Sequence, residues 1–231
     1  EGQELRRISA WHDIPLYHTG YGENATILNY VNEIPKYTRA KYEIATREQY
    51  NPIKQDVRNG RVRFYQHGDL SWNYGMFPQT YEDPSFISPE TDCPGDNDPI
   101  DVIEIGARQI PVGAVVPVKV LGVLALIDDG ETDWKNIAIS VNDPMAHLLN
   151  NIEDVERELP GLLNAIREYF RKYKVCTGKE ENSFGLDGKV MDRKFALRVV
   201  HETHTQWKKL RENEKAPQPV FTPQPVENGK I

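Results

Sequence analysis

Cysteine is nearly absent from this chain of 231 residues, which contains two, Cys93 and Cys176. Two cysteines cannot build the dense disulfide framework of a small secreted domain, so the sequence favours a reducing compartment. We therefore predict a cytoplasmic protein. An organelle is the alternative if a targeting segment has been removed, because the chain does not begin with Met.

Long apolar runs and a basic excess are missing as well. No stretch approaches the roughly 20 apolar residues of a membrane span, so we predict no membrane partner. Lys and Arg number 28 against 35 Asp and Glu, which gives a formal net charge of −7. An acidic chain does not hold nucleic acid non-specifically, so we predict no nucleic-acid partner. A phosphate-bearing substrate would need local cations to capture it.

Several catalytic motifs are also absent. The six histidines show no HExxH or other metal-binding spacing. The chain contains no Walker loop and no GxSxG nucleophile elbow. The sequence thus offers no sign of a zinc protease, a P-loop nucleotide site or a serine hydrolase of the α/β type.

What the chain does contain is two short segments dense in carboxylates. The acidic side chains are Asp96, Asp98 and Asp101 in the first segment, and Asp128, Asp129, Glu131 and Asp133 in the second. At about 4 Å and an effective dielectric near 20, two like charges repel by about 4 kcal/mol. Hard divalent cations with oxygen ligands would relieve that repulsion. A magnesium enzyme acting on phosphates is therefore the leading interpretation.

Simpler interpretations of the same segments remain open. The first segment could be a solvated acidic turn, but a calcium loop of the EF-hand type fails because Ala107 stands where a glutamate is needed. On a strand, Asp96 and Asp98 would point to one side, and Pro99 would let Asp101 return to the same cavity. In the second segment Lys135 lies two residues after Asp133, which suits either a polyanion site or an ordinary surface salt bridge.

The first two thirds of the chain predict strands. Alternating or continuous apolar patterns cover 27–34, 40–46, 61–65, 100–105, 115–127 and 134–141. Asn59-Gly60 and Asp129-Gly130 are typical of hairpin turns. About five strands joined by tight turns favour a closed barrel over a parallel sheet.

The last third changes to helical spacing. Asn142-Asp143-Pro144 predicts a helix start, and apolar residues at helical spacing continue through 159–173. Asp192 could cap a further helix whose apolar face includes Ala196, Val199 and Val200. From Ala216 the chain is rich in proline, so we predict one domain over 1–215 and a Pro-rich flexible tail over 216–231.

Several motifs together resemble one known family. The run GDNDPIDVIEIG (95–106) resembles the signature of the family I soluble inorganic pyrophosphatases. The resemblance is supported by five further runs, EIPKYTRAKYEI (33–44), NYGMFPQTYEDP (73–84), DDGETDWK (128–135), NDPMA (142–146) and YKVCTGKEEN (173–182). The resemblance covers roughly residues 8–210 and is closest to the eukaryotic type. The segment between Arg63 and Tyr74 departs from the family pattern, since it carries Asp69 and Trp72.

The resemblance implies a mainly β fold, a five-stranded OB-like closed barrel with C-terminal helices. It also implies magnesium-dependent hydrolysis of inorganic pyrophosphate to two orthophosphates. A water that bridges metal ions would attack directly, without a covalent intermediate, and several Mg²⁺ ions would occupy each site. Relatives of the eukaryotic type imply a homodimer.

The resemblance further implies a role for each matching residue. Asp98 would orient and deprotonate the attacking water, and Tyr74 would be the second catalytic residue. The metal ligands would be Asp96, Asp101, Asp133, Asp128 and Glu43, with Glu33 and Glu131 in the outer shell. Substrate phosphates would be held by Lys41, Arg63, Tyr74, Lys135, Tyr173 and Lys174.

Three other functions remain open. A metal-dependent phosphohydrolase for nucleotides or longer polyphosphate would use similar carboxylates. An OB-type binding module without catalysis would need aromatic platforms and a basic groove, whereas the expected groove here is acidic. The Pro-rich tail could add a scaffold role to catalysis.

Overall fold

The structure, a computed structural model, describes residues 7–19 and 26–215. Five strands form the centre of the fold. They are β1 (Ile27–Ile34), β6 (Asn73–Met76), β9 (Asp101–Glu104), β10 (Val115–Asp128) and β11 (Glu131–Ser140). Hydrogen-bonded pairs follow the order β1, β6, β9, β11, β10 and return from β10 to β1. The pairings therefore run round a complete ring, as the sequence predicted for a five-stranded barrel.

One neighbouring pair in the ring is parallel and places two charged residues side by side. Strands β9 and β11 run in the same direction with Asp101 in register with Lys135, whereas the other pairs in the ring are antiparallel. The long strands β10 and β11 meet at the turn Asp129-Gly130, where both residues have positive φ of 53° and 86°. This is the hairpin that the sequence predicted.

Short strands extend or flank the barrel. Strands β12 (Ser183–Phe184) and β13 (Met191–Asp192) add to β10. Three small hairpins pair β2 (Tyr42–Ile44) with β3 (Ile53–Gln55), β4 (Val57–Arg58) with β5 (Arg61–Val62), and β7 (Ile87–Ser88) with β8 (Cys93–Pro94). Two predicted strands, 40–46 and 61–65, are thus parts of side hairpins, and the barrel uses β6 instead.

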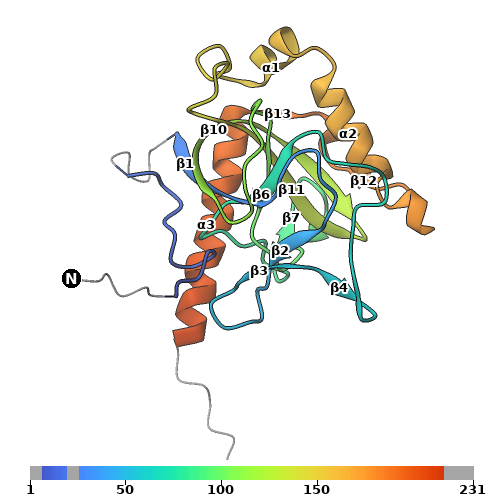
Figure 1. Cartoon of the computed structure of the whole chain (residues 1–231). Helices are drawn as coiled ribbons and strands as arrows, with labels where there is room; N and C mark the ends of the chain where they lie inside the picture. The colour runs from blue at the N-terminus through green and yellow to red at the C-terminus, as the bar shows by residue number, and fades with distance from the viewer. Residues whose placement is uncertain (1–6, 20–25, 216–231) are drawn as a thin grey trace, which may run out of the picture.

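Three α-helices cover the barrel (Figure 1). Helices α1 (Ile152–Glu158) and α2 (Leu162–Lys172) lie together at one end, and the long α3 (Arg193–Lys215) runs along one flank. Two 3₁₀ turns, η1 (Val175–Thr177) and η2 (Leu186–Gly188), join these elements. The predicted tail, 216–231, lies outside the described residues.

Helices α3 and α2 pack against two separate clusters of the hydrophobic core. Ala196, Val199 and Val200 of α3 are buried in a cluster that includes Val120 of β10. Ile166 and Phe170 of α2 are buried in a second cluster with further strand residues. As predicted, Asp192 caps α3, because its Oδ1 accepts a hydrogen bond from the Phe195 amide at 2.8 Å.

The predicted helix start at 142–144 is wrong, because the segment 141–149 forms turns and α1 begins only at Ile152. Asp143 is buried, and its carboxylate accepts hydrogen bonds from the amides of Ala107 at 2.7 Å and Met145 at 2.9 Å. Its side chain therefore braces the loop after β9 and its own turn. The α1 start uses Asp154 instead, whose carboxylate accepts from the Asn151 amide at 3.1 Å.

Candidate metal and phosphate site

A cavity of about 190 Å³ opens at one side of the barrel. Its lining includes seven carboxylate side chains, Glu33, Glu43, Asp96, Asp98, Asp101, Asp128 and Asp133. Four basic side chains, Lys41, Arg63, Lys135 and Lys174, line the same space. The cavity thus gathers the two acidic segments that lie some thirty residues apart in the chain.

Strand register places the innermost charges. Lys135, 2% exposed, donates a hydrogen bond to Asp101 Oδ2 at 2.5 Å and another to Asp133 on its own strand. Burial alone lowers the pKa of Lys135, but the carboxylates of Asp101 and Asp133 reverse that effect and raise it. Lys135 therefore stays protonated, and the fold fixes its positive charge against the carboxylates of Asp101 and Asp133.

A loop before β9 supplies the next carboxylates. Asp96 and Asp98 lie in this loop rather than on a strand, so the expected strand geometry is wrong although both side chains line the cavity. Asn97 between them has a positive φ of 72°. Gly95 fits against the backbone of Glu82, where a Cβ would lie 2.4 Å from the Glu82 carbonyl carbon, so a side chain here would push the loop out of place.

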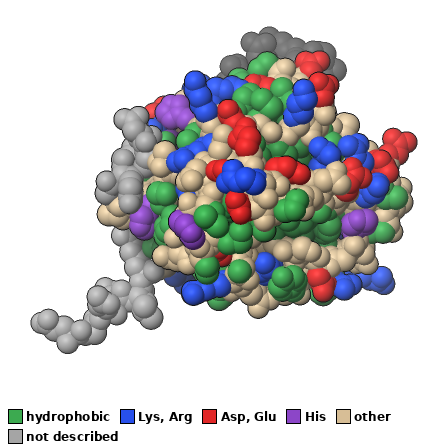
Figure 2. All heavy atoms as spheres, turned by 90° about the horizontal axis from the view of Figure 1, so that it is seen from above, with side chains coloured by type: hydrophobic (Ala, Val, Ile, Leu, Met, Phe, Trp, Pro, Cys, Tyr) green, Lys and Arg blue, Asp and Glu red, His purple; other side chains and the backbone are tan. Residues whose placement is uncertain are grey.

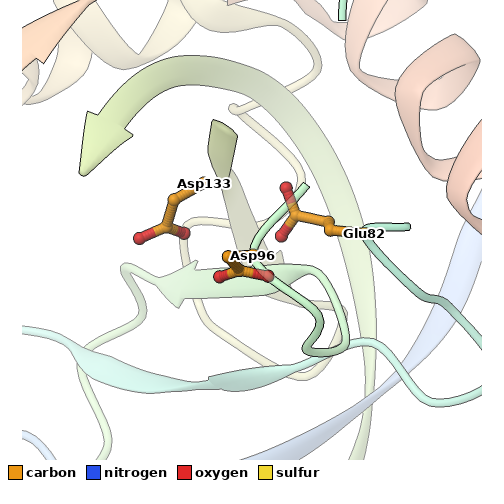
Figure 3. Close-up of side chains that lie close together, drawn as sticks. All are labelled: Glu82, Asp96 and Asp133. Carbon is orange, nitrogen blue, oxygen red and sulfur yellow. The ribbon is translucent and has the colours of Figure 1, made fainter. Parts of the chain in front are cut away.

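Glu82 is a site residue that the sequence analysis did not assign. Its side chain comes from the segment after β6 and points toward Asp96 and Asp133 (Figure 3). One oxygen atom from each of the three carboxylates lies within 4.8 Å of the others. Glu82 Oε1 accepts from the Trp134 amide at 3.0 Å, whereas Oε2 is buried without a hydrogen-bond partner. The motif NYGMFPQTYEDP contains Glu82, but its sequence position gives no sign of this approach.

Burial and mutual repulsion raise the pKa values of carboxyl groups in this cluster. Burial first and the charge of Asp96 second raise the pKa of Glu82 well above its ordinary value. Burial and Asp133 likewise raise the pKa of Asp96. A group of three neighbouring carboxylates, one of which has a buried oxygen without a donor, fits a site for a hard divalent cation with oxygen ligands.

Asp98 differs from these carboxylates because its side chain is exposed to the cavity and makes no hydrogen bond among the described residues. Crowding by protein atoms, together with the charges of Glu43 and Asp101, raises the pKa of Asp98 to about 7. A carboxylate with a pKa near neutrality can exchange a proton with a reactant at ordinary pH.

The side hairpins form a mixed wall. Lys41, directly before β2, pairs with Glu43 of β2 and with Asp56 at 3.4 Å, and Arg63 also pairs with Asp56. Burial lowers the pKa of Lys41, but Glu43 and Asp56 more than offset this and raise it. Asp56 was not assigned from the sequence, since an isolated aspartate after a short strand carries no pattern. It holds both cations toward the cavity.

The end of α2 completes the opposite wall. Tyr173 donates a hydrogen bond to Asp128 Oδ2 at 2.6 Å, and Lys174 pairs with Asp128 and with Asp129 at 2.9 Å. Tyr74 on β6 donates to Asp101 Oδ2 at 2.5 Å. Hydroxyl and ammonium donors therefore alternate with carboxylates around the cavity.

The structure brings together all but one of the predicted site residues. Glu33 is 4% exposed, lines the cavity and accepts from the Ile44 amide at 2.8 Å. Glu131 is exposed at the start of β11 and does not line the cavity. In the departing segment, Asp69 pairs with Arg39 at 2.6 Å, Trp72 is buried in the core and Tyr65 lines the cavity. The departure thus leaves the cavity walls intact.

The fold and the site define a class of protein, an OB-like barrel whose cavity has groups suited to cations and to phosphate-type anions. The chain matches the family model described as inorganic pyrophosphatase over residues 30–208. It therefore belongs to the inorganic pyrophosphatase family.

Individual relatives agree. The chain is 54% identical over 207 residues to the inorganic pyrophosphatase of Schizosaccharomyces pombe, covering 88% of this chain and 71% of the relative. It is 49% identical over 206 residues to the chloroplastic soluble inorganic pyrophosphatase 6 of Arabidopsis thaliana, covering 89% and 67%. These relatives extend the resemblance beyond the motifs.

Solved structures confirm the fold class. An N-terminally truncated Trypanosoma cruzi vacuolar soluble pyrophosphatase, crystallised in complex with PPi, superposes with a TM-score of 0.85 at 52% identity, covering 89% of this chain and 80% of that chain. A recombinant inorganic pyrophosphatase from Trypanosoma brucei brucei gives a TM-score of 0.86 at 50% identity, covering 91% of this chain and 63% of that chain.

Within the described residues, no helix combines the length and the apolar character needed to cross a membrane.

Proposed function

We propose that this chain hydrolyses inorganic pyrophosphate to two orthophosphates with the help of Mg²⁺. The observation that carries the proposal is the cavity in which seven carboxylates meet four basic side chains. Acidic groups suit cations and basic groups suit phosphate oxygens, so the two sets together suit a metal–diphosphate complex. The names of the relatives support the same substrate.

The residues proposed to hold the metal ions are Asp96, Asp101, Asp133, Asp128 and Glu43. Glu82 joins this set because its carboxylate lies close to those of Asp96 and Asp133 and its buried Oε2 atom has no hydrogen-bond partner. Glu33 is proposed to lie in the outer shell of the metal site, and it also accepts a hydrogen bond from the Ile44 amide. The same outer-shell role for Glu131 rests on the family resemblance. Bound divalent cations would offset the charge of the substrate and lower the pKa of an attacking water.

The basic and phenolic residues hold the phosphate groups in this scheme. Lys41, Arg63, Lys135 and Lys174 present fixed positive charge, and Tyr74 and Tyr173 add hydroxyl donors. Pyrophosphate carries several negative charges, so binding requires this positive charge before a nucleophile can approach. The same donors then stabilise the charge that builds on the leaving phosphate.

Water is the proposed nucleophile and Asp98 the group that takes its proton. The family resemblance implies direct attack by water without a covalent intermediate, and the described residues that line the cavity, which include no Ser, Thr, Cys or His, are consistent with this route. The Asp98 carboxylate reaches the cavity without a competing hydrogen bond, and in the metal-free protein burial and the charges of Glu43 and Asp101 raise its pKa to about 7. It can therefore accept a proton from the attacking water and release it to solvent after each turnover.

A substrate panel tests the assignment. Pyrophosphate, tripolyphosphate and ATP are each supplied with Mg²⁺, and orthophosphate release is measured. The proposal expects pyrophosphate to be hydrolysed with the highest kcat/KM. Preference for ATP would favour the nucleotide phosphohydrolase, and no release from any of the three would favour a binding module.

Domain extent, oligomeric state and compartment extend the proposal. Residues 1–215 are proposed to be one catalytic domain and 216–231 a separate Pro-rich tail. Free Cys93 and Cys176 support a reducing compartment such as the cytoplasm. The family resemblance supports a homodimer, for which light scattering would give twice the chain mass of 26.5 kDa.

A further inference from the structure

A larger cavity, about 810 Å³ in volume, lies beside the start of α3 and away from the acidic cavity. Most of the described side chains that line it are apolar or aromatic, namely Tyr17, Leu28, Met191, Phe195, Leu197 and Val200. We call this space the α3 groove. None of the described residues that line it also lines the acidic cavity, so the groove is a separate surface.

The lining of the α3 groove leaves apolar side chains partly open to water. Met191, Phe195 and Leu197 are half-buried rather than buried. On the face that Figure 2 shows, charged side chains of both signs are interspersed with apolar ones. A contiguous apolar lining of this size is typical of a place where a further segment packs.

The Pro-rich tail contains a short repeat that suits such a groove. The run Pro-Gln-Pro-Val stands at 217–220 and again at 223–226. A polyproline II helix has about three residues per turn, so positions three apart share one ridge. One ridge of the tail is therefore wholly apolar and consists of Pro217, Val220, Pro223 and Val226. Polyproline II segments pack into grooves lined by aromatic side chains, which Tyr17 and Phe195 supply here.

The tail is long enough to return to the groove from the end of α3. This helix is continuous along the flank of the barrel (Figure 1). At about 1.5 Å per residue, Val200 lies about 22 Å and Phe195 about 30 Å from its last residue, Lys215. At about 3.1 Å per residue, a polyproline II helix reaches about 25 Å at Pro223 and about 34 Å at Val226. If the tail runs back along α3, its second Pro-Gln-Pro-Val run comes level with the groove.

The charges favour the same register. Glu227 is the one acidic residue of the segment 216–231, and it directly follows Val226. In this register it comes close to Lys194, which is exposed, lines the groove and pairs with no carboxylate among the described residues. Arg198, by contrast, already pairs with Glu90 at 2.6 Å. An exposed ion pair adds little affinity, but it fixes the direction of the segment.

We propose that the segment 217–226 docks in cis into the α3 groove as a polyproline II helix that runs antiparallel to α3. The direct connection to the end of α3 keeps the effective concentration of the segment high, so modest contacts are sufficient. Docking covers the apolar lining and attaches the tail to the barrel. The inference concerns a surface apart from the acidic cavity and does not rest on the proposed function.

Methyl NMR of the full chain tests this inference. In a sample deuterated except for the Val and Leu methyl groups and the Phe and Tyr rings, we expect a nuclear Overhauser cross-peak between the Val226 methyl groups and the Phe195 ring. Val226→Asp places a charge on the apolar ridge and leaves the described fold untouched. It should shift the methyl resonances of Leu197 and Val200 and lower the Tm by about 2–4 °C.

Thr222→Asp is the matched control, because it adds the same charge on a ridge that faces away from the groove in this register. It should keep the cross-peak, the methyl resonances and the Tm of the wild type. Absence of the cross-peak between Val226 and Phe195 in the wild type would overturn the inference, as would equal methyl shifts in the two variants.

A mixed sample separates docking in cis from docking on a second copy. One half of the chains carries protons only on Val methyl groups, and the other half only on Phe rings. Docking in cis predicts no cross-peak between Val226 and Phe195 in this mixture. A cross-peak there would place the tail on a second copy of the chain and would refute the proposed arrangement.

Discussion

Replacing Asp98 by Asn tests the proposed proton acceptor at a position where folding should not suffer. The Asp98 side chain makes no hydrogen bond among the described residues, and its charge is crowded by Glu43 and Asp101. An amide of the same shape removes that repulsion, so the free energy of unfolding should not fall. The amide cannot accept a proton, and loss of a general base lowers kcat by about 10²- to 10⁴-fold, or ~3–5 kcal/mol in the barrier.

Steady-state orthophosphate release at saturating Mg²⁺ and pyrophosphate measures this effect. Calorimetric Mg²⁺ titration without substrate should show affinity close to that of the wild type, and thermal melting should show an equal or higher Tm. Asp69→Asn is the matched control, since Asp69 pairs with Arg39 on the surface and does not line the cavity. A kcat for Asp98→Asn within a few fold of the wild type would refute the assigned role.

Three further predictions follow from single contacts. Tyr74→Phe removes one hydrogen bond to Asp101, so kcat should fall by about tenfold or less; a loss as large as that of Asp98→Asn would contradict this ranking. Glu82→Gln removes one of three crowded carboxylates, so it should weaken Mg²⁺ binding about 10- to 100-fold. In EDTA the same change should raise the Tm, because it relieves the repulsion among the three groups. Unchanged Mg²⁺ affinity would exclude Glu82 from the site. Burial first, and Arg211 second, lower the pKa of His12 to about 4 from 6.5, so the folded state favours the neutral ring. The contribution of His12 to the free energy of unfolding should therefore fall as the pH drops below 6.5, by about 2 kcal/mol between pH 7.5 and 5. Urea unfolding at both pH values should show this change in the difference between the wild type and His12→Gln.

Several parts of the fold could be predicted because the pattern and the local chemistry agree. The long strands β10 and β11 have continuous apolar runs and a turn whose residues, Asp129 and Gly130, both adopt positive φ. By contrast, β6 was missed, since four fully buried residues with a glycine show no alternation. Gly75 is needed there because a Cβ would lie 2.1 Å from the Val31 carbonyl oxygen, a packing constraint that no local pattern reveals.

The site was predicted mainly from the motifs, and the structure shows why spacing alone was insufficient. Lys135 meets Asp101 through the parallel pairing of β9 and β11, a contact across 34 residues. Glu82 and Asp56 join the site through tertiary packing, so their sequence neighbourhoods carried no sign of their position. The expected strand at Asp96 and Asp98 was wrong, although the loop brings both side chains to the cavity.

The central claim is that the acidic cavity acts on pyrophosphate only when divalent cations occupy it. Orthophosphate release from pyrophosphate, followed as Mg²⁺ is raised from zero in EDTA to saturation, tests this most directly. We expect background release in EDTA and a rise to a plateau as Mg²⁺ fills the cavity. Full activity in EDTA, or none at any Mg²⁺ concentration, would contradict it.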